Sequence, residues 1–175
     1  MNYSQALKKL KESGRCSCPN CVIIELSRED GVKKEVKFWK DLSKNLPLSF
    51  MRRVESTFDP GWPDVHYSHE GNMGWLELKA EHKFPNQIDF QPAQPLWLTK
   101  YWASGGNCYI LLKVIDENKV YVWAGKDAMK LDAKGGTHAV EPMLEINCSA
   151  RGWKELYDMF GLLTPRYPTR NLRIV

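Results

Sequence analysis

The sequence of 175 residues lacks any apolar run that approaches the roughly 18 residues expected of a membrane span. Residues 1–5 lack the apolar core of a signal peptide, which predicts a cytoplasmic protein with no membrane partner. Cysteine is scarce, and its odd count of five argues against a disulfide scaffold. Internal repeats are also absent. In contrast, 7 tryptophans and 7 tyrosines are enough to predict an ordered chain, and the length predicts one domain.

The net charge of +4 is unevenly distributed along the chain. Residues 1–60 hold 12 Lys and Arg against 8 Asp and Glu, and residues 126–175 hold 8 against 6. The middle, residues 61–125, holds 5 against 7. An acidic middle between basic ends fits a cation site flanked by surfaces that attract phosphate, although the same distribution can arise by chance.

The most informative motif is an aspartate followed by a Glu-x-Lys pair. Asp64 follows Gly-x-Pro, and Glu77 and Lys79 lie in an apolar segment beyond a polar stretch, residues 68–74, with two glycines. That stretch predicts a hairpin turn, which would bring Asp64 beside Glu77. Because side chains alternate along a strand, Glu77 and Lys79 share one face. Two carboxylates and one amine on one surface suit a hard cation and a polarised water.

Hydrophobic periodicity predicts a helix at each end of the chain and further elements between them. We expect helices over residues 2–13, 33–45, 94–102 and 152–160. We expect strands over residues 22–26, 108–114 and 120–123. Two more strands carry the Asp and the Glu-x-Lys motif. Residues 50–58 are expected to form a strand or an irregular segment. Residues 84–95 are predicted to form a polar loop.

Several short patterns occur in a fixed order and resemble one nuclease family. They are Gly61-x-Pro63-Asp64, Glu77-x-Lys79, Gln94 at a helix start, Gly105-Gly106, and an apolar strand from Cys108 to Val114. This order resembles the VRR-NUC branch of the PD-(D/E)XK nucleases, over roughly residues 34–123. Stand-alone phage-type members also carry a helix with Glu and Phe-Trp and then Arg-x-Glu, which here are Glu35, Phe38-Trp39 and Arg53-Val54-Glu55.

The resemblance implies an α/β, restriction-endonuclease-like fold, in which a mixed central β-sheet is flanked by helices and the site lies at one sheet edge. It implies that Asp64, Glu77 and the carbonyl of Leu78 bind Mg²⁺ or Mn²⁺, and that Lys79 orients or activates the attacking water. The alternatives are a turn role for Asp64 and a solvated strand face for the Glu-x-Lys pair.

Two further catalytic residues are implied by position in the family pattern. Glu35 matches an acidic residue that the leading helix presents to the site, with Glu55 as the second choice. Gln94 matches the glutamine that supports the site or touches DNA. The alternatives are a solvated helix face for Glu35 and a helix-capping or surface role for Gln94.

Three of the five cysteines are clustered as Cys16-x-Cys18-x-x-Cys21, outside the resemblance. Clustered thiols in a cytosolic chain indicate zinc more than disulfides. Three ligands do not close a structural zinc site, so a fourth is expected from Cys108, Cys148 or His82. The alternative is that the three thiols are free or partly buried.

Together these patterns predict a Mg²⁺-dependent, structure-specific DNA endonuclease that cuts branched DNA such as Holliday junctions as a homodimer. The alternatives are a nuclease for plain or flapped duplex, or a non-enzymatic, zinc-containing nucleic-acid-binding protein. We expect an N-terminal extension with the cysteine cluster (1–32), a nuclease core (33–125), and a C-terminal extension with a basic tail (126–175). Five arginines are expected to contact phosphate, unless the tail merely aids solubility: Arg52, Arg53, Arg166, Arg170 and Arg173.

Overall fold

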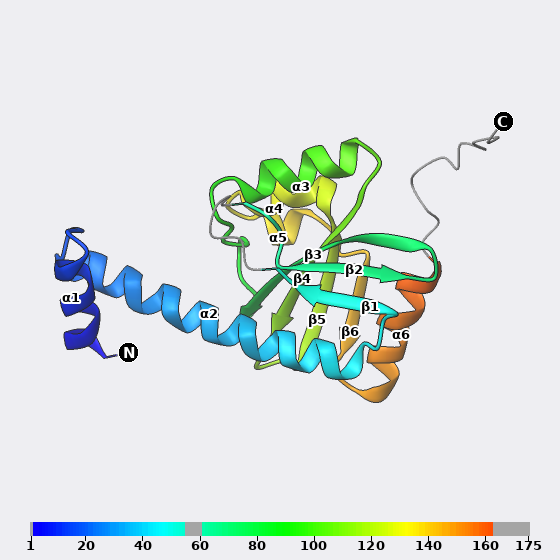
Figure 1. Cartoon of the computed structure of the whole chain (residues 1–175), viewed down its shortest axis with the longest axis horizontal. Coiled ribbons are helices and arrows are strands. Elements are labelled where there is room, and N and C mark those ends of the chain that lie inside the picture. The colour runs from blue at the N-terminus through cyan, green and yellow to red at the C-terminus, as the bar shows by residue number, and fades with distance from the viewer. Residues whose placement is uncertain (1, 55–60, 163–175) are drawn as a thin grey trace.

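The computed structural model describes residues 2–54 and 61–162 of the chain (Figure 1). Six strands form one sheet in the order of the sequence. The strands β3 and β4 are parallel and all other neighbours are antiparallel, so the sheet is mixed. The strands are β1 (Phe50–Arg53), β2 (Val65–His69), β3 (Asn72–Glu81), β4 (Asn107–Val114), β5 (Lys119–Ala124) and β6 (Leu144–Asn147).

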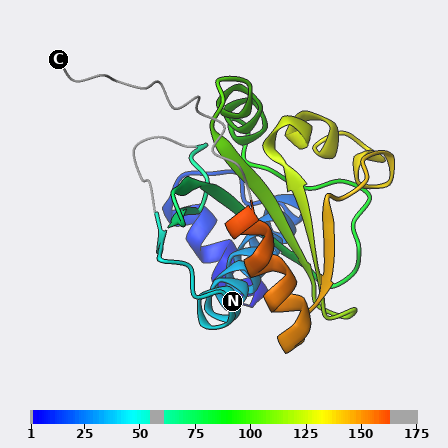
Figure 2. The same cartoon turned by 90° about the vertical axis from the view of Figure 1, so that its right-hand side faces the viewer.

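Helices cover both faces of this sheet (Figures 1 and 2). On one face, α3 (Gln94–Ala103), the short α4 (Ala128–Leu131) and α5 (Gly136–Ala139) lie over a core that includes Leu98 and Trp123. The other face is covered by the second half of α2 (Pro19–Asn45) and by α6 (Ala150–Leu162). The predicted α/β fold, a mixed central sheet flanked by helices, is therefore confirmed.

The predicted hairpin between the Asp64 and Glu-x-Lys segments is confirmed and is tighter than expected. Strands β2 and β3 are joined by two residues, Glu70 and Gly71, whose φ angles are 49° and 80°. Two positive φ angles in a two-residue loop match the twist of the strands that flank it, and glycine at the second position adopts this conformation without strain. The turn fixes the register in which Val65 pairs with Leu76.

The predicted strand over residues 22–26 is wrong, because this segment lies in α2, which runs for 27 residues and also contains the predicted helix 33–45. Pro19 occupies the first turn of α2, where proline is compatible with a helix. In the helical conformation, Val22 is buried against Ala6 and Leu10 of α1 (Tyr3–Glu12). Glu25 is buried too and forms an ion pair with Lys9 at 2.7 Å. These tertiary contacts outweigh the slight preference of β-branched residues for strands.

The N-terminal half of α2 extends away from the sheet and carries α1 at its far end (Figure 1). Helix α1 begins with a capping box, in which Asn2 and Gln5 exchange hydrogen bonds of 3.0 Å each. We refer to α1, the connecting residues 13–18 and the first turns of α2 as the N-terminal arm. Helix α2 continues without a break through the expected boundary between residues 32 and 33.

The remaining elements agree with the predicted order. The predicted helices at residues 2–13, 94–102 and 152–160 correspond to α1, α3 and α6, and the predicted strands at 108–114 and 120–123 correspond to β4 and β5. The segment 50–58 forms β1 over its first four residues, and 55–60 lie outside the described residues. Strand β6, the helices α4 and α5 and the 3-10 turn Gly125–Asp127 were not predicted. In the described ranges, every helix is too short or too polar to span a membrane.

Candidate active site

The β2–β3 hairpin brings Asp64 and Glu77 together. Asp64 immediately precedes β2, and because Val65 pairs with Leu76, the next position on β3 is Glu77. Two hydrogen bonds fix Asp64 in place. Its Oδ2 accepts a bond of 2.8 Å from the backbone N–H of Leu78, and its carbonyl accepts one of 2.7 Å from the N–H of Val54. The aspartate therefore extends the β1–β2 pairing through its carbonyl and is tied to β3 through its side chain.

The bond from Leu78 also orients the carbonyl of this residue. In a β-strand, the N–H and the C=O of one residue point toward the same neighbouring strand. This is why two opposite residues of an antiparallel pair can form two N–H···O=C hydrogen bonds with each other. Since the N–H of Leu78 points to the carboxylate of Asp64, its carbonyl points to the same side of β3. The backbone oxygen predicted as a metal ligand thus lies on the side of the strand where Asp64 is held.

Glu77 is fully buried, with 0% of its surface exposed. Among the described residues, neither of its carboxylate oxygens has a hydrogen-bond donor in good geometry, although Lys79 Nζ lies 3.0 Å from Oε1. Burial is the main cause that raises the pKa of Glu77 to about 8, against the opposing effect of Lys79. Burial also raises the pKa of Asp64, in spite of its bond to Leu78. The Lys79 ammonium therefore compensates only in part for the burial of this carboxylate.

Lys79 lies at the centre of the site. Its Nζ is 3.0 Å from Glu77, 3.8 Å from Glu35 Oε1 and 3.5 Å from Gln94 Oε1. It also lies 5.5 Å from the centre of the Phe90 ring. Burial acts to lower the pKa of Lys79, but the surrounding carboxylates outweigh it and raise the pKa to about 12. The side chain is therefore a cation at neutral pH.

Helix α2 supplies the third carboxylate, Glu35, which reaches Lys79 from outside the sheet. Burial raises its pKa to about 7, opposed by the positive charges of Lys79 and Arg53 and reinforced by Asp64. Glu35 thus belongs to the same electrostatic cluster as Asp64, Glu77 and Lys79, in agreement with its predicted place. The rival residue Glu55 lies outside the described residues.

Gln94 is the first residue of α3 and is buried. Its side-chain oxygen accepts a hydrogen bond of 2.9 Å from the backbone N–H of Gln91 and one of 3.5 Å from Lys79. The glutamine therefore links the loop before α3 to the lysine of β3. Because Gln94 is buried and contacts Lys79, it does not have the surface role that was one alternative for this residue.

A cleft of about 1080 Å³ opens beside Lys79 and Glu35. It is bounded by α2, the end of β3 and the loop before α3, and its lining includes Glu81, Lys34 and Phe90. Lys34 and Glu81 form an ion pair at 3.0 Å across it. Sequence reasoning did not select these three residues, although Glu81 continues the alternation of Glu77 and Lys79. The loop over residues 84–95 was predicted to be polar and irregular. That prediction did not indicate that the loop forms a wall of the cleft.

The expectation that the site lies at one sheet edge is wrong, since β3 is the third of six strands. The site lies where β2 ends beside β3 and α2 and the loop before α3 approach from either side. On the edge strand β1, Arg52 is exposed and Arg53 is half-buried. Arg53 lies close enough to Asp64 and Glu35 for its charge to lower the pKa of both. The other arginines predicted to bind phosphate lie outside the described residues: Arg166, Arg170 and Arg173.

A series of aromatic rings adjoins the site. Trp75 lies on the same face of β3 as Glu77, and its ring lies 5.3 Å from Trp62 and 5.0 Å from His66. Trp62 lies 5.7 Å from Trp97, which stacks on Tyr101 at 4.8 Å. Trp62 is 40% exposed, so the series reaches the surface only two residues before Asp64.

The cysteine cluster is remote in the fold, at the corner between α1 and α2. The described structure brings Cys16, Cys18 and Cys21 together but adds none of the fourth ligands that were considered. Cys108 is in the core and donates to the carbonyl of Leu98, and His82 lies 3.3 Å from Asp116. The last candidate is Cys148, which follows β6 and packs against the core under α2 and α6.

Comparisons with known proteins give limited similarity. No family model matches the sequence, and no curated protein matches it. Among solved structures, the chain is similar to Hjc, a Holliday junction resolvase from the archaeal hyperthermophile Archaeoglobus fulgidus, with 18% identity and a TM-score of 0.41. The match covers 55% of this chain and 78% of that one. A similarity of this extent does not identify the family of the chain.

Proposed function

We propose that this protein is a metal-dependent endodeoxyribonuclease that hydrolyses phosphodiester bonds at the site formed by Asp64, Glu77 and Lys79. The observation that carries the proposal is the state of Glu77. Glu77 is fully buried beside Asp64, and its ion pair with Lys79 at 3.0 Å does not outweigh the burial that raises its pKa to about 8, so a further cation would stabilise both carboxylates in their charged form. A phosphodiester is anionic, and a site that combines carboxylates, a cation and a lysine can reduce its resistance to attack.

The donor set fits Mg²⁺ or Mn²⁺. The carboxylates of Asp64 and Glu77, which are opposite each other in the β2–β3 register, and the carbonyl of Leu78 are hard oxygen ligands, and Mg²⁺ needs only one or two carboxylates since it keeps several waters. When bound, such an ion neutralises charge on the phosphate and lowers the pKa of its water. One oxygen of Asp64 is held by Leu78 N–H, which leaves its other oxygen for this role.

The remaining groups have separate tasks in this proposal. Lys79 is a cation that Gln94 and the carboxylates hold in one position, so its Nζ can orient the attacking water and offset phosphate charge. Glu35 has a pKa raised to about 7, so its carboxyl can exchange protons near neutral pH, as general acid–base catalysis requires. Gln94 is a positioning residue, because it acts on Lys79.

We further propose that the substrate is branched DNA of the Holliday-junction type and that the protein acts as a homodimer. The resemblance of the sequence motifs to stand-alone VRR-NUC nucleases supports both statements. Two symmetric cuts need two sites, and closed two-fold association provides them. The exposed Trp62 at the end of the aromatic series suits stacking on a base at the branch point, where the stacking of the arms is interrupted.

The proposal is tested by incubating the protein with Mg²⁺ and three DNA substrates: a four-way junction, a flap and a linear duplex. We expect cleavage of the junction, lost in Asp64→Asn while binding is retained. Asp132→Asn, which changes an exposed aspartate far from the site in sequence, is the matched control and should cut normally. Preferred cutting of the flap or the duplex would show that this DNA, and not the junction, is the substrate. Binding without any cutting would support the rival hypothesis of a non-enzymatic nucleic-acid-binding protein.

A further inference from the structure

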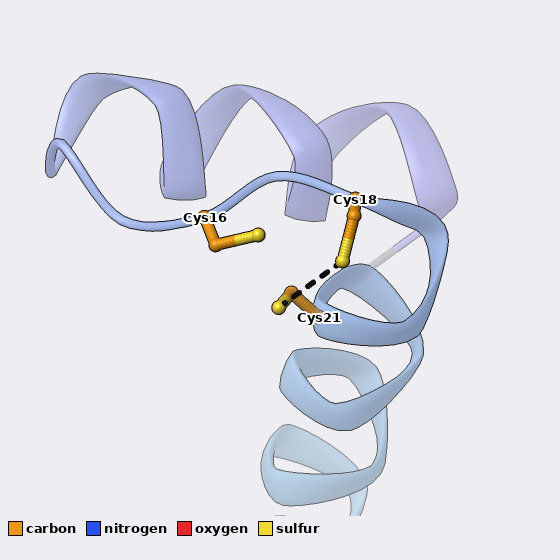
Figure 3. Close-up of side chains that lie close together, drawn as sticks. All are labelled: Cys16, Cys18 and Cys21. Atoms are coloured by element: carbon orange, nitrogen blue, oxygen red, sulfur yellow. Dashed lines mark hydrogen bonds between the residues drawn. The ribbon is translucent and has the colours of Figure 1, made fainter.

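Three thiols converge at the corner of the N-terminal arm, where the chain passes from α1 into α2 (Figure 3). The sulfur atoms of Cys16, Cys18 and Cys21 all lie within 4.8 Å of one another, and those of Cys18 and Cys21 are 3.4 Å apart. Cys16 and Cys18 are exposed and Cys21 is half-buried. The cluster is therefore accessible from solvent, and the nuclease proposal does not use it.

The spacing of these sulfurs matches a metal site better than a disulfide. Zinc binds thiolate at about 2.3 Å, so two sulfurs of a tetrahedral site are about 3.8 Å apart. The separation of 3.4 Å between Cys18 and Cys21 is close to that value, and the other two separations do not exceed 4.8 Å. A disulfide joins two sulfurs at about 2.05 Å and would leave the third thiol without a role.

The position of the cluster at the start of α2 favours thiolates. Cys18 is the N-cap of this helix of 27 residues, Pro19 follows it, and Cys21 lies in the first turn. Free N–H groups and the positive end of the helix dipole stabilise negative charge there. Cysteine binds a metal as the thiolate, and this position at the start of the helix favours that form.

The arm is held together by a small core. Helix α1 is attached to α2 through three buried side chains, Ala6, Leu10 and Val22, against which Leu7, Cys21 and Leu26 pack, and through ion pairs from Lys9 and Arg15 to Glu25. A core of this size supplies little folding free energy, and small units of this kind usually need a metal or a cross-link. Cys16 lies in the connection after α1 and Cys21 lies in α2, so an ion between them would join the two helices.

We propose that Cys16, Cys18 and Cys21 bind one Zn²⁺ per chain and that this ion fixes α1 against α2. Within residues 2–54 and 61–162, no fourth histidine, cysteine or carboxylate converges on the three sulfurs. The fourth ligand therefore comes from outside this set, as a water, a small ligand or a residue beyond the described ranges. The ion acts on the arm alone, so the proposal is independent of the nuclease chemistry at Glu77.

The test is a zinc determination on the full-length protein, purified under reducing conditions without chelator. We expect about one zinc per chain in the native protein and in the control Cys148→Ser, and a loss of nearly all of it in Cys16→Ser. Replacement of zinc by Co²⁺ should give the thiolate-to-cobalt charge-transfer absorption in the first two proteins and not in Cys16→Ser. Hydrogen exchange of the α1 amides should accelerate in that variant, while amides of β3 and β4 stay protected and Mg²⁺-dependent cutting continues.

A second measurement keeps the test valid if Cys16→Ser fails to fold. A mercurial thiol reagent added to the native protein should release zinc, detected with a chromogenic chelator, in proportion to the thiols that react. The proposal is overturned by native protein without zinc, whether its thiols are free or Cys18 and Cys21 form a disulfide in mass spectra. It is also overturned by zinc that persists in a folded Cys16→Ser variant, or by one zinc shared between two chains.

Discussion

Removing the charge of Glu77 should stabilise the metal-free protein while it abolishes catalysis. The carboxylate is fully buried, has no donor in good geometry among the described residues, and has a pKa raised from the ordinary 4.5 to about 8. That difference corresponds to on the order of 5 kcal/mol of unfolding free energy at high pH. A buried glutamine still needs hydrogen bonds, which cost about 1–3 kcal/mol if unmade. We therefore expect Glu77→Gln to gain on the order of 2–4 kcal/mol above pH 8.

The pH dependence has a definite sign. Between the ordinary pKa of 4.5 and about 8, folded wild-type protein holds a proton on Glu77 that the unfolded chain releases. Stability from this group is complete below the unfolded pKa and is lost as pH rises through the folded value. The variant lacks this loss, so it should be less stable than wild type near pH 5, by about the 1–3 kcal/mol of its unmade hydrogen bonds, and more stable than wild type toward pH 9. Glu35 also has a raised pKa, but it titrates in both proteins. Its effect on the pH dependence of unfolding therefore cancels to first order when wild type and variant are compared.

The assay is thermal unfolding in chelator at pH 5, 7 and 9 for wild type, Glu77→Gln and the control Glu141→Gln, whose side chain is exposed. Each kcal/mol should shift the melting temperature by roughly 2–4 °C in a chain of this size. Added Mg²⁺ should raise the melting temperature of wild type at pH 9 and should not raise that of Glu77→Gln. Two outcomes would contradict the raised pKa of Glu77. One is equal stability of wild type and Glu77→Gln at pH 9, and the other is a wild type whose stability relative to the variant increases as pH rises.

Three further outcomes follow from the site and its surroundings. Lys79→Ala should reduce cleavage about 100-fold or more while Mg²⁺ affinity, measured by calorimetry, survives; near-normal turnover would remove the lysine from the mechanism. Trp62→Ala should weaken binding of DNA with a branch point by roughly 1–3 kcal/mol and leave binding of linear duplex unchanged, as compared by fluorescence anisotropy. Replacing Arg166, Arg170 and Arg173 with alanine should flatten the dependence of log affinity on log salt, by roughly 0.9 for each phosphate that the tail no longer neutralises; an unchanged slope would indicate a merely solubilising tail.

Features governed by local sequence could be predicted. The hairpin follows from strand alternation on either side of Glu70 and Gly71, and it is enough to place Asp64 opposite Glu77 and to put Lys79 on the same face. The convergence of the thiols is local as well, because Cys18 and Cys21 are separated by less than one helical turn.

Features that depend on distant parts of the chain could not be predicted. The apolar run from Val22 fits a strand or a buried helix equally well. The packing of Val22 against Leu10 of α1 stabilises the helix. The complete burial of Glu77 depends on α3 and the loop before it, and the cleft depends on the approach of α2 to the end of β3. Nothing in the Glu-x-Lys motif itself distinguishes a buried carboxylate from one on a solvated strand face.

The most direct test of the central claim is single-turnover cleavage of a labelled four-way junction by the wild-type protein, Asp64→Asn and Glu77→Gln, with and without Mg²⁺. Junction binding is measured in parallel on the same preparations. We predict that only wild type with Mg²⁺ cuts the junction, while both variants still bind it. Cutting by wild type in the absence of any divalent cation, or by Asp64→Asn at the wild-type rate, would contradict the assignment of the site.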